Sequence, residues 1–238
     1  MIAILKKEFN SFFASSIAYL VIGVFLLING LFLFIFNGNF NILNAGFADL
    51  NPFFFLTPLV FIFLIPAITM KSFADEFNNG TIELLKTKPI SNWQIVLGKF
   101  WAALLLVVLA LIPTFTYVHT VYQLGNPIGN IDFGATIGSY IGLFFLAATY
   151  TAIGLFTSTL SKNQIVAFIL GVFSTFFLFY GFDAISNSFD NNLTIQQIGI
   201  NEHFKSISRG VIDTRDILYF LSVTIFFLFI TKTRLNNE

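Results

Sequence analysis

The polar stretch MKSFADEFNNGTIELLKTKPISNWQIVLGK (residues 70–99) lies between apolar runs that are long enough to cross a membrane. Seven of the chain's 24 charged residues fall in it. Of the 238 residues, 56% are hydrophobic and 10% are charged, whereas a soluble domain carries about 25% charged residues. Composition therefore predicts a membrane protein in which this stretch, called here the polar segment, lies in water or against a soluble partner.

Six apolar runs are each long enough to cross a hydrocarbon core of roughly 30 Å as a helix. We place them at residues 17–36, 53–70, 98–122, 133–158, 165–182 and 217–231. The predicted fold is thus an all-α, multi-pass membrane protein with a single transmembrane domain over residues 1–238. An even number of spans puts both termini and the polar segment on one side, together with nine basic residues against three on the other. The excess of positive charge predicts that this side is the cytoplasm.

The first 16 residues precede the first span without a signal-peptide cleavage site. Apolar residues recur at helical spacing from Ile2 to Phe13, while Lys6 and Lys7 lie on other faces. This pattern predicts an amphipathic helix that lies in the plane of the lipid headgroups.

The polar segment contains the signals of a helix, a turn and a second, short helix. Asn-Asn-Gly at residues 78–80 is typical of a turn, because Gly and Asn adopt positive φ. Thr81 is then expected to cap a short helix over residues 82–87, which Pro89 ends. The Ser-x-x-Gln pattern at residues 91–94 predicts a capping box that begins the next helix. Ile82 and Leu85 share one face of the short helix, and an apolar face left in water predicts a docked partner.

Several spans carry residues that disturb or tighten helix packing. Pro58 and Pro66 predict a kink or a break in the second span, and Pro113 lies near the middle of the third. A stripe of small residues lies on the fourth span and consists of Gly134, Gly138 and Gly142. That stripe fits packing against a helix of the same subunit or an interface between two subunits.

The loop before the last span contains a predicted short helix at the depth of the outer leaflet. Asn201 is expected to cap it, Phe204, Ile207 and Val211 to share a face, and Gly210 to end it. Asp213 or Thr214 is then expected to cap the last span.

Several classes of function have no support in the residues. The chain has no cysteine and a net charge of zero, so thiolate chemistry is excluded and an electrostatic nucleic-acid binder is not favoured. No G-x-x-x-x-G-K-[ST] phosphate-binding loop, metal cluster or nucleophilic triad is present in the sequence, so catalytic, cofactor-binding and metal sites are predicted to be absent from this chain.

The polar segment resembles that of the ABC-2 type transporter permeases, whose loose pattern E-x-x-x-G-T-x-E-x-L-x-x-x-P-[IV]-[ST] is followed by G-K. The residues that match are Glu76, Gly80, Thr81, Glu83, Leu85, Pro89, Ile90 and Ser91, with Gly98 and Lys99. His203-Phe204 and the run from Arg209 to Asp213 are further similar to the gliding-motility-associated permease subunits of that family.

The resemblance implies a half-transporter without its own ATPase site. ATP and Mg²⁺ would be bound by a separate nucleotide-binding subunit, and a second permease subunit, favoured to be a different chain, would complete the membrane part. The resemblance places the chain in a bacterial inner membrane. Residues that would couple to the ATPase are Glu76, Gly80, Thr81, Ile82, Glu83, Leu84, Leu85 and Pro89.

Two other functions remain open at this point. A non-transporting scaffold would pass ATP-driven motion to a motility or envelope machine, and the sparse polar residues of the spans favour it slightly. An ion-coupled carrier is disfavoured, because such carriers need an ionisable group inside the membrane and His119, towards the outer end of the third span, is the single titratable candidate.

Overall fold

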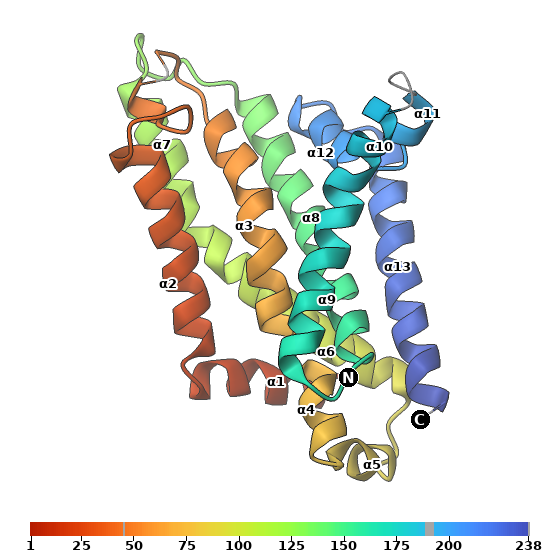
Figure 1. Cartoon of the computed structure of the whole chain (residues 1–238). Coiled ribbons are helices and arrows are strands. Elements are labelled where there is room, and N and C mark those ends of the chain that lie inside the picture. The colour runs from red at the N-terminus through yellow and green to blue at the C-terminus, as the bar shows by residue number, and fades with distance from the viewer. Residues whose placement is uncertain (45, 189–192, 238) are drawn as a thin grey trace.

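The computed structural model describes residues 1–44, 46–188 and 193–237, and within these ranges the chain is helical without any strand (Figure 1). Six helical segments have the length and hydropathy needed to cross a membrane, which confirms the six predicted spans. They are Ile17–Ile35, Asn51–Asn78, Asn92–Leu124, Phe133–Ser158, Gln164–Ser188 and Thr214–Asn236. The second and third are longer than predicted, because helical structure continues into the polar segment from both sides.

Helix α8 forms the centre of the bundle. Its bounds and those of its neighbours are Phe133–Ser158 for α8, Asn51–Thr69 for α3, Asn92–Leu111 for α6, Gln164–Phe176 for α9 and Thr214–Asn237 for α13. Within the most apolar part of each span, 78% of α8 is buried but only 22% of the segment that contains α9. Small residues bring α8 close to its neighbours, and Gly154 leaves the space that Thr69 of α3 fills.

The helices deviate from regular α-geometry at three places in the spans. Helix α2 (Ile17–Gly30) and helix α9 each end in a π-helical turn, Leu31–Ile35 and Phe177–Gly181. Around Pro113, α6 gives way to a 3-10 turn (Ile112–Thr114) before α7 (Phe115–Leu124), so the expected irregularity is confirmed.

The second span does not break at its prolines. Helix α3 continues through Pro58 and Pro66 and ends only at Thr69. A proline removes its own N–H but its carbonyl still accepts a hydrogen bond. Accordingly, the N–H of Met70 donates to the carbonyl of Pro66 at 2.8 Å, and α4 (Lys71–Asn78) begins one residue later.

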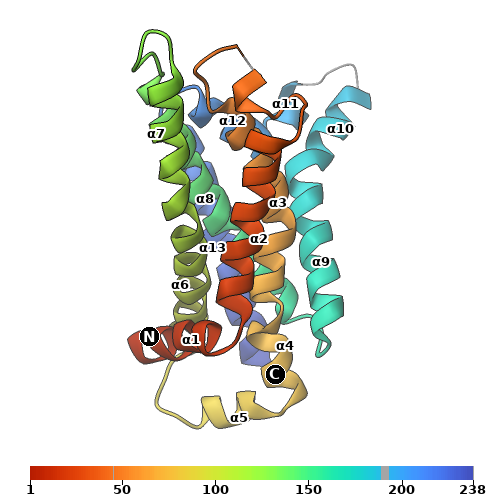
Figure 2. The same ribbon diagram turned by 90° about the vertical axis from the view of Figure 1, so that its left-hand side faces the viewer.

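Both termini lie at the end of the bundle where the polar segment folds (Figures 1 and 2). Helix α1 (Ile2–Ala14) forms as predicted and runs across this end, roughly perpendicular to the spans. Its residues Ile4 and Phe12 are buried against the bundle, whereas Ile2 is exposed. Its location in the headgroup plane stays a prediction.

At the opposite end, α10 (Phe182–Ser188) continues the fifth span, and two short helices, α11 (Leu193–Gln196) and α12 (Ile200–Ser208), lie between it and α13 along the chain. The buried residues Phe204 and Ile207 attach α12 to α8 and α13. His203 adds a polar link, because its Nδ1 lies 2.7 Å from Oδ1 of the buried Asp216 in α13.

Two details of this end were predicted wrongly. Asn201 does not cap α12, whose N-cap is Gly199; its side chain instead donates to Oδ2 of Asp183 at 2.6 Å. Val211 does not share the buried face, since α12 ends at Ser208 and Val211 is 71% exposed. Gly210, with φ of 85°, turns the chain away after α12, and Asp213 accepts the N–H of Arg215 at the start of α13.

Candidate functional site

The polar segment folds into two helices that project beyond the spans. Helix α4 continues the direction of α3, and a turn at Gly80, with φ of 67°, leads into α5 (Thr81–Lys86). Helix α5 is the outermost element at the end that carries both termini (Figures 1 and 2). A left-handed conformation is accessible to glycine without steric strain, which explains its place in this turn.

Most of the local structure of this segment agrees with the prediction from its sequence. The Ser91 hydroxyl accepts the N–H of Gln94 at 3.3 Å and the Gln94 side chain accepts the N–H of Ser91 at 3.3 Å, so the capping box is confirmed. The prediction that Thr81 caps α5 is wrong. Thr81 is the first residue of α5, Gly80 occupies the N-cap, and the Thr81 hydroxyl donates to the carbonyl of Glu76 at 3.5 Å.

The apolar residues of α5 that are buried and exposed differ from the prediction. Ile82 is only 7% exposed and belongs to the hydrophobic core, and Leu85 is half-buried against that core. Helix α5 packs on α4, so the face that was expected to await a partner is covered by the same chain. The exposed apolar side chain is Leu84, at 66%. The other predicted coupling residues that reach the surface are Gly80, Thr81, Glu83 and Pro89.

Glu76, predicted to couple to the ATPase, is part of an ion cluster around the buried Lys99, which also includes the exposed Lys7 at 3.6 Å from its Oε1. Its Oε1 lies 2.8 Å from Nζ of Lys99 at the start of α6, and the Lys99 side chain is 2% exposed. The same ammonium group lies 3.0 Å from Oε1 of Glu8 in α1 and donates to the carbonyl of Ser72 at 2.7 Å. An ammonium group has three donors, and all three have an acceptor here.

This Lys99 cluster joins three elements that are distant in sequence. Glu8 comes from α1, Glu76 and Ser72 from α4, and Lys99 from α6. Removing one partner of a buried ion pair leaves an uncompensated charge and destabilises a protein by about 3–5 kcal/mol. A displacement of α4 is therefore coupled to α1 and to the third span.

Close packing reinforces the contact between α1 and α6. A Cβ placed on Gly98 would lie 2.9 Å from Cβ of Ile4 and 3.2 Å from the carbonyl oxygen of Met1. The glycine therefore lets α1 lie directly on α6, next to the Lys99 cluster. The two residues of the Gly-Lys pair thus have neighbouring structural roles. Gly98 allows close contact with α1, and Lys99 pairs with the carboxylates.

A further polar contact connects α4 to the fifth span. The side-chain amide of Gln164, the first residue of α9, donates to Oδ1 of Asp75. Sequence reasoning missed this contact and the Lys99 cluster, because the residues are separated by 89, 91 and 23 positions. The available signal was that Glu8 and Glu76 have no lysine or arginine three or four positions away in their own helices.

The glycine stripe of α8 packs against α12 of the same chain. A Cβ on Gly138 would lie 2.6 Å from the carbonyl oxygen of Ile207, and one on Gly142 would lie 3.2 Å from the ring of Phe204. Gly134 packs closely as well, since its carbonyl carbon would lie 2.8 Å from a Cβ placed on Gly210. Of the two alternatives for the stripe, packing within the subunit is the one present here.

Charged groups are sparse in the rest of the bundle. Among the described residues, no group of three or more His, Cys, Asp or Glu side chains gathers as a metal site. His119 lies exposed on α7, towards the end opposite α5. The polar chemistry at the α5 end thus consists of ion pairs and hydrogen bonds between helices.

Comparison with models of protein families identifies the family of this chain. The family model described as ABC-2 family transporter protein matches residues 2–231, nearly the whole chain. No curated protein matches this sequence. With its six apolar spans and the polar segment between the second and third, the chain belongs to the ABC-2 family of transporter proteins.

Proposed function

We propose that this chain is the membrane-spanning subunit of an ABC transporter and that a separate nucleotide-binding subunit docks on α5. The observation that carries the proposal is the position of α5, which lies outside the spans and packs on α4, which in turn contacts α3, α8 and α9. Leu84 and Glu83 are exposed on it, so an apolar contact and a charge are available to a partner. ATP and Mg²⁺ would be bound by that partner.

The coupling follows from the contacts of α4. A push on α5 reaches α3 through the nearly continuous helix, α6 and α1 through Lys99, and α9 through Gln164. A ligand or partner shifts a conformational equilibrium only through different contacts in its two states. Docking would therefore move α4 and, through these contacts, change the angles between the spans that α4 contacts.

The orientation in the membrane is part of this proposal. Nine basic residues lie on the side of α5, and three lie on the other. The α5 side would accordingly face the cytoplasm of a bacterial inner membrane, with both termini there. The nine are Lys6, Lys7, Lys71, Lys86, Lys88, Lys99, Lys162, Lys232 and Arg234.

The biological setting rests on the sequence resemblance alone. Similarity of the run from Arg209 to Asp213 to gliding-motility-associated permeases supports a role in gliding motility or secretion. It also supports a second, different permease subunit as the partner in the membrane. The same coupling would serve transport of a substrate or mechanical work on an envelope machine.

Replacing Leu84 with aspartate is expected to reduce the amount of ATPase that co-purifies with the chain at least tenfold. A charge at the centre of an apolar contact must be desolvated without a partner, which costs several kcal/mol, and 1.4 kcal/mol is tenfold in affinity. The measurement is the ATP hydrolysis and the subunit composition of complexes isolated from membranes.

Val211→Asp is the matched control, because Val211 is exposed to a similar extent, 71% against 66%, at the opposite end of the molecule. Glu83→Ala is expected to weaken docking of the ATPase. Glu76→Ala is expected mainly to lower the stability of the chain, because Glu76 pairs with the buried Lys99. Equal recovery of ATPase with Leu84→Asp and with the unchanged chain would exclude α5 as the docking site.

A further inference from the structure

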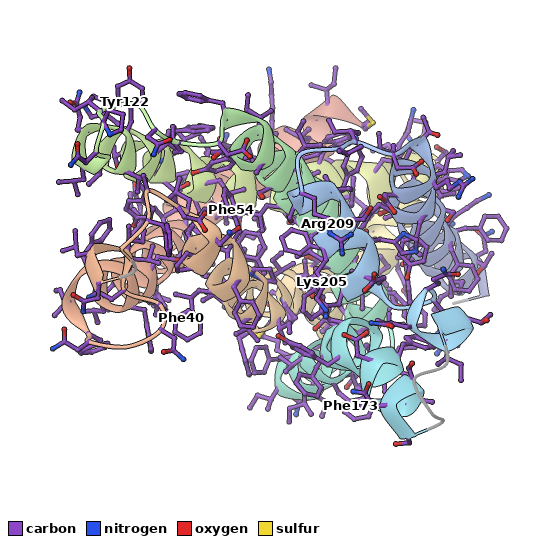
Figure 3. The ribbon with its side chains drawn as sticks, turned by 90° about the horizontal axis from the view of Figure 1, so that it is seen from above. Phe40, Phe54, Tyr122, Phe173, Lys205 and Arg209 are labelled. Atoms are coloured by element: carbon purple, nitrogen blue, oxygen red, sulfur yellow. The ribbon has the colours of Figure 1, made fainter. Side chains whose placement is uncertain are left out.

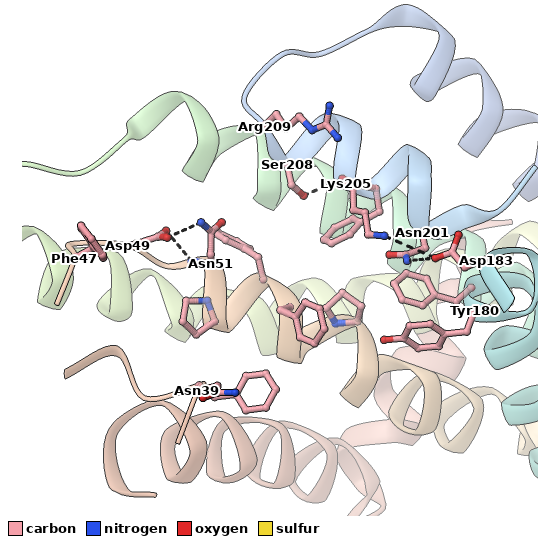
Figure 4. A pocket seen from close by; sticks show the side chains of 17 residues that line it. Asn39, Phe47, Asp49, Asn51, Tyr180, Asp183, Asn201, Lys205, Ser208 and Arg209 are labelled. Atoms are coloured by element: carbon pink, nitrogen blue, oxygen red, sulfur yellow. Dashed lines mark hydrogen bonds and ion pairs between the residues drawn. The ribbon is translucent and has the colours of Figure 1, made fainter. Parts of the chain in front are cut away.

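A cavity of about 960 Å³ opens at the end of the bundle opposite α5. Its walls come from the loop before α3, the first two turns of α3, the π-helical turn after α9, and one face of α12 (Figures 3 and 4). Ligand sites in proteins have volumes of about 300–1,000 Å³, so this cavity is large enough for a sizeable molecule.

The two parts of the cavity differ in chemistry. Aromatic side chains supply most of the apolar wall, namely Phe40, Phe47, Phe54, Phe55, Phe179, Tyr180 and Phe204. Polar and charged side chains from α12, from α10 and from the start of α3 form the other part (Figure 4). An apolar wall beside a polar one matches a molecule that has an apolar chain and a polar head.

Lys205 and Arg209 place two cations on the α12 side of the cavity. They are four residues apart, with Lys205 in the second half of α12 and Arg209 at its C-cap. Nζ of Lys205 lies 3.7 Å from Oδ2 of Asp183, which also accepts from Asn201. Arg209 is exposed and forms no ion pair among the described residues.

The acidic residues of the cavity have partners within its own lining, although Oδ1 of Asp183 is buried without a hydrogen-bond partner. Asp183 is shared by Lys205 and Asn201, and Asp49 accepts the backbone N–H of Asn51 at 2.9 Å at the start of α3. Of the two cations in the cavity lining that the structure describes, the guanidinium of Arg209 is therefore the one without a carboxylate. Arginine binds phosphate through parallel, charge-assisted hydrogen bonds, which makes phosphate the anion that this group fits best.

Helix α12 is held rigidly enough to present these cations. His203 is fixed by Asp216 of α13 on one side, and the backbone of Ile207 lies against Gly138 of α8 on the other. A site whose groups are fixed before binding loses less conformational entropy on binding.

We propose that this cavity binds a phospholipid of the leaflet remote from α5, with its phosphate at Arg209 and an acyl chain along the aromatic wall. The cavity lies at the outer ends of the spans, where lipid headgroups are expected, and its lining extends along α3 as far as Pro58. The proposal concerns lipid binding by this chain and does not depend on docking of an ATPase at α5.

Native mass spectrometry of the full chain in detergent tests the proposal. The probes are phosphatidylglycerol, an uncharged glycosyl diacylglycerol with the same acyl chains, and soluble glycerol phosphate. We expect phosphatidylglycerol to bind at least tenfold more tightly than either of the other two. Arg209→Gln should lower the affinity for phosphatidylglycerol about tenfold, because hydrogen bonds to charged groups contribute about 1.5–3 kcal/mol.

Two matched controls separate the cavity from the general surface. Arg215→Gln removes an exposed cation at the same end that does not line the cavity, and it should leave the affinity unchanged. Phe55→Ala should weaken binding, whereas Phe63→Ala, on the same helix and exposed to the same extent (58% against 59%), should not.

Three outcomes would overturn the proposal. Equal binding of the glycosyl lipid would exclude recognition of phosphate, and full competition by glycerol phosphate would exclude a role for the apolar wall. An equal loss of affinity in Arg209→Gln and Arg215→Gln would show attraction by surface charge alone. Both arginines are exposed, so the variants are expected to fold, and equal melting temperatures would verify this.

Discussion

Replacing Lys99 with methionine is expected to lower the melting temperature of the purified chain by on the order of 10 °C. The change leaves Glu8 and Glu76 with only the exposed Lys7, whose Nζ lies 3.4 and 3.6 Å from their Oε1 atoms, and breaking a buried pair costs about 3–5 kcal/mol. For a chain of this length, 1 kcal/mol shifts the melting temperature by about 2–4 °C. Thermal unfolding in detergent, followed by intrinsic fluorescence, measures the effect.

Lys88→Met is the matched control, because Lys88 is exposed in the same segment and no ion pair involves it among the described residues. Adding Glu8→Gln and Glu76→Gln to Lys99→Met should restore part of the lost stability, since the repelling carboxylates are then neutral. If Lys99→Met and Lys88→Met melt at the same temperature, the cluster does not join α1, α4 and α6 energetically.

The second large effect is expected at Gly138, where alanine should destabilise the chain by about 1–3 kcal/mol, the usual effect of overpacking. The added Cβ would lie 2.6 Å from the carbonyl oxygen of Ile207 and 3.0 Å from Cα of Gly210. Both are backbone atoms, so no change of rotamer relieves the contact and α12 must move. The same measurement of thermal unfolding detects the loss.

Gly30→Ala is the control for Gly138→Ala. Gly30 also lies in a membrane-spanning helix, but a Cβ placed there has no atom within 4 Å. Alanine is favoured over glycine in a helix by about 1 kcal/mol, so this variant should be as stable as the unchanged chain or slightly more stable. Equal melting temperatures for the two variants would show that α12 is free to shift away from α8.

The sequence was sufficient for features that depend on local chemistry or on the membrane. Six spans follow from hydropathy because the bilayer imposes a minimum length on each helix. The positive φ of Gly80, the capping box of Ser91 and Gln94, and the irregularity at Pro113 follow from the backbone preferences of those residues. Each of these depends on neighbours within a few positions along the chain.

Features that depend on distant partners were missed or assigned to the wrong partner. Glu76 matched a family pattern and was taken for a docking residue, yet its partner Lys99 lies within the bundle. Ile82 was expected in water because nothing nearby in the sequence covers it, whereas the fold places it in the core beside α4. The periodicity of α5 identifies an apolar face but does not indicate which element covers that face.

Helix α12 shows the same limit. Its existence and its apolar residues Phe204 and Ile207 were predicted, but the glycine stripe that receives them lies about 65 residues earlier in the chain. Three small residues at helical spacing predict a close contact, and they do not say whether the contacting helix belongs to the same chain.

Site-specific cross-linking from α5 tests the central claim most directly. The chain has no cysteine, so Leu84→Cys provides a single reactive thiol on the exposed face of α5, and Val211→Cys provides one at the opposite end. In membranes treated with a short thiol-reactive photo-cross-linker, we expect position 84 alone to form an adduct with an ATP-hydrolysing subunit. An adduct with that subunit from position 211, or none from position 84 in an intact complex, would contradict the account.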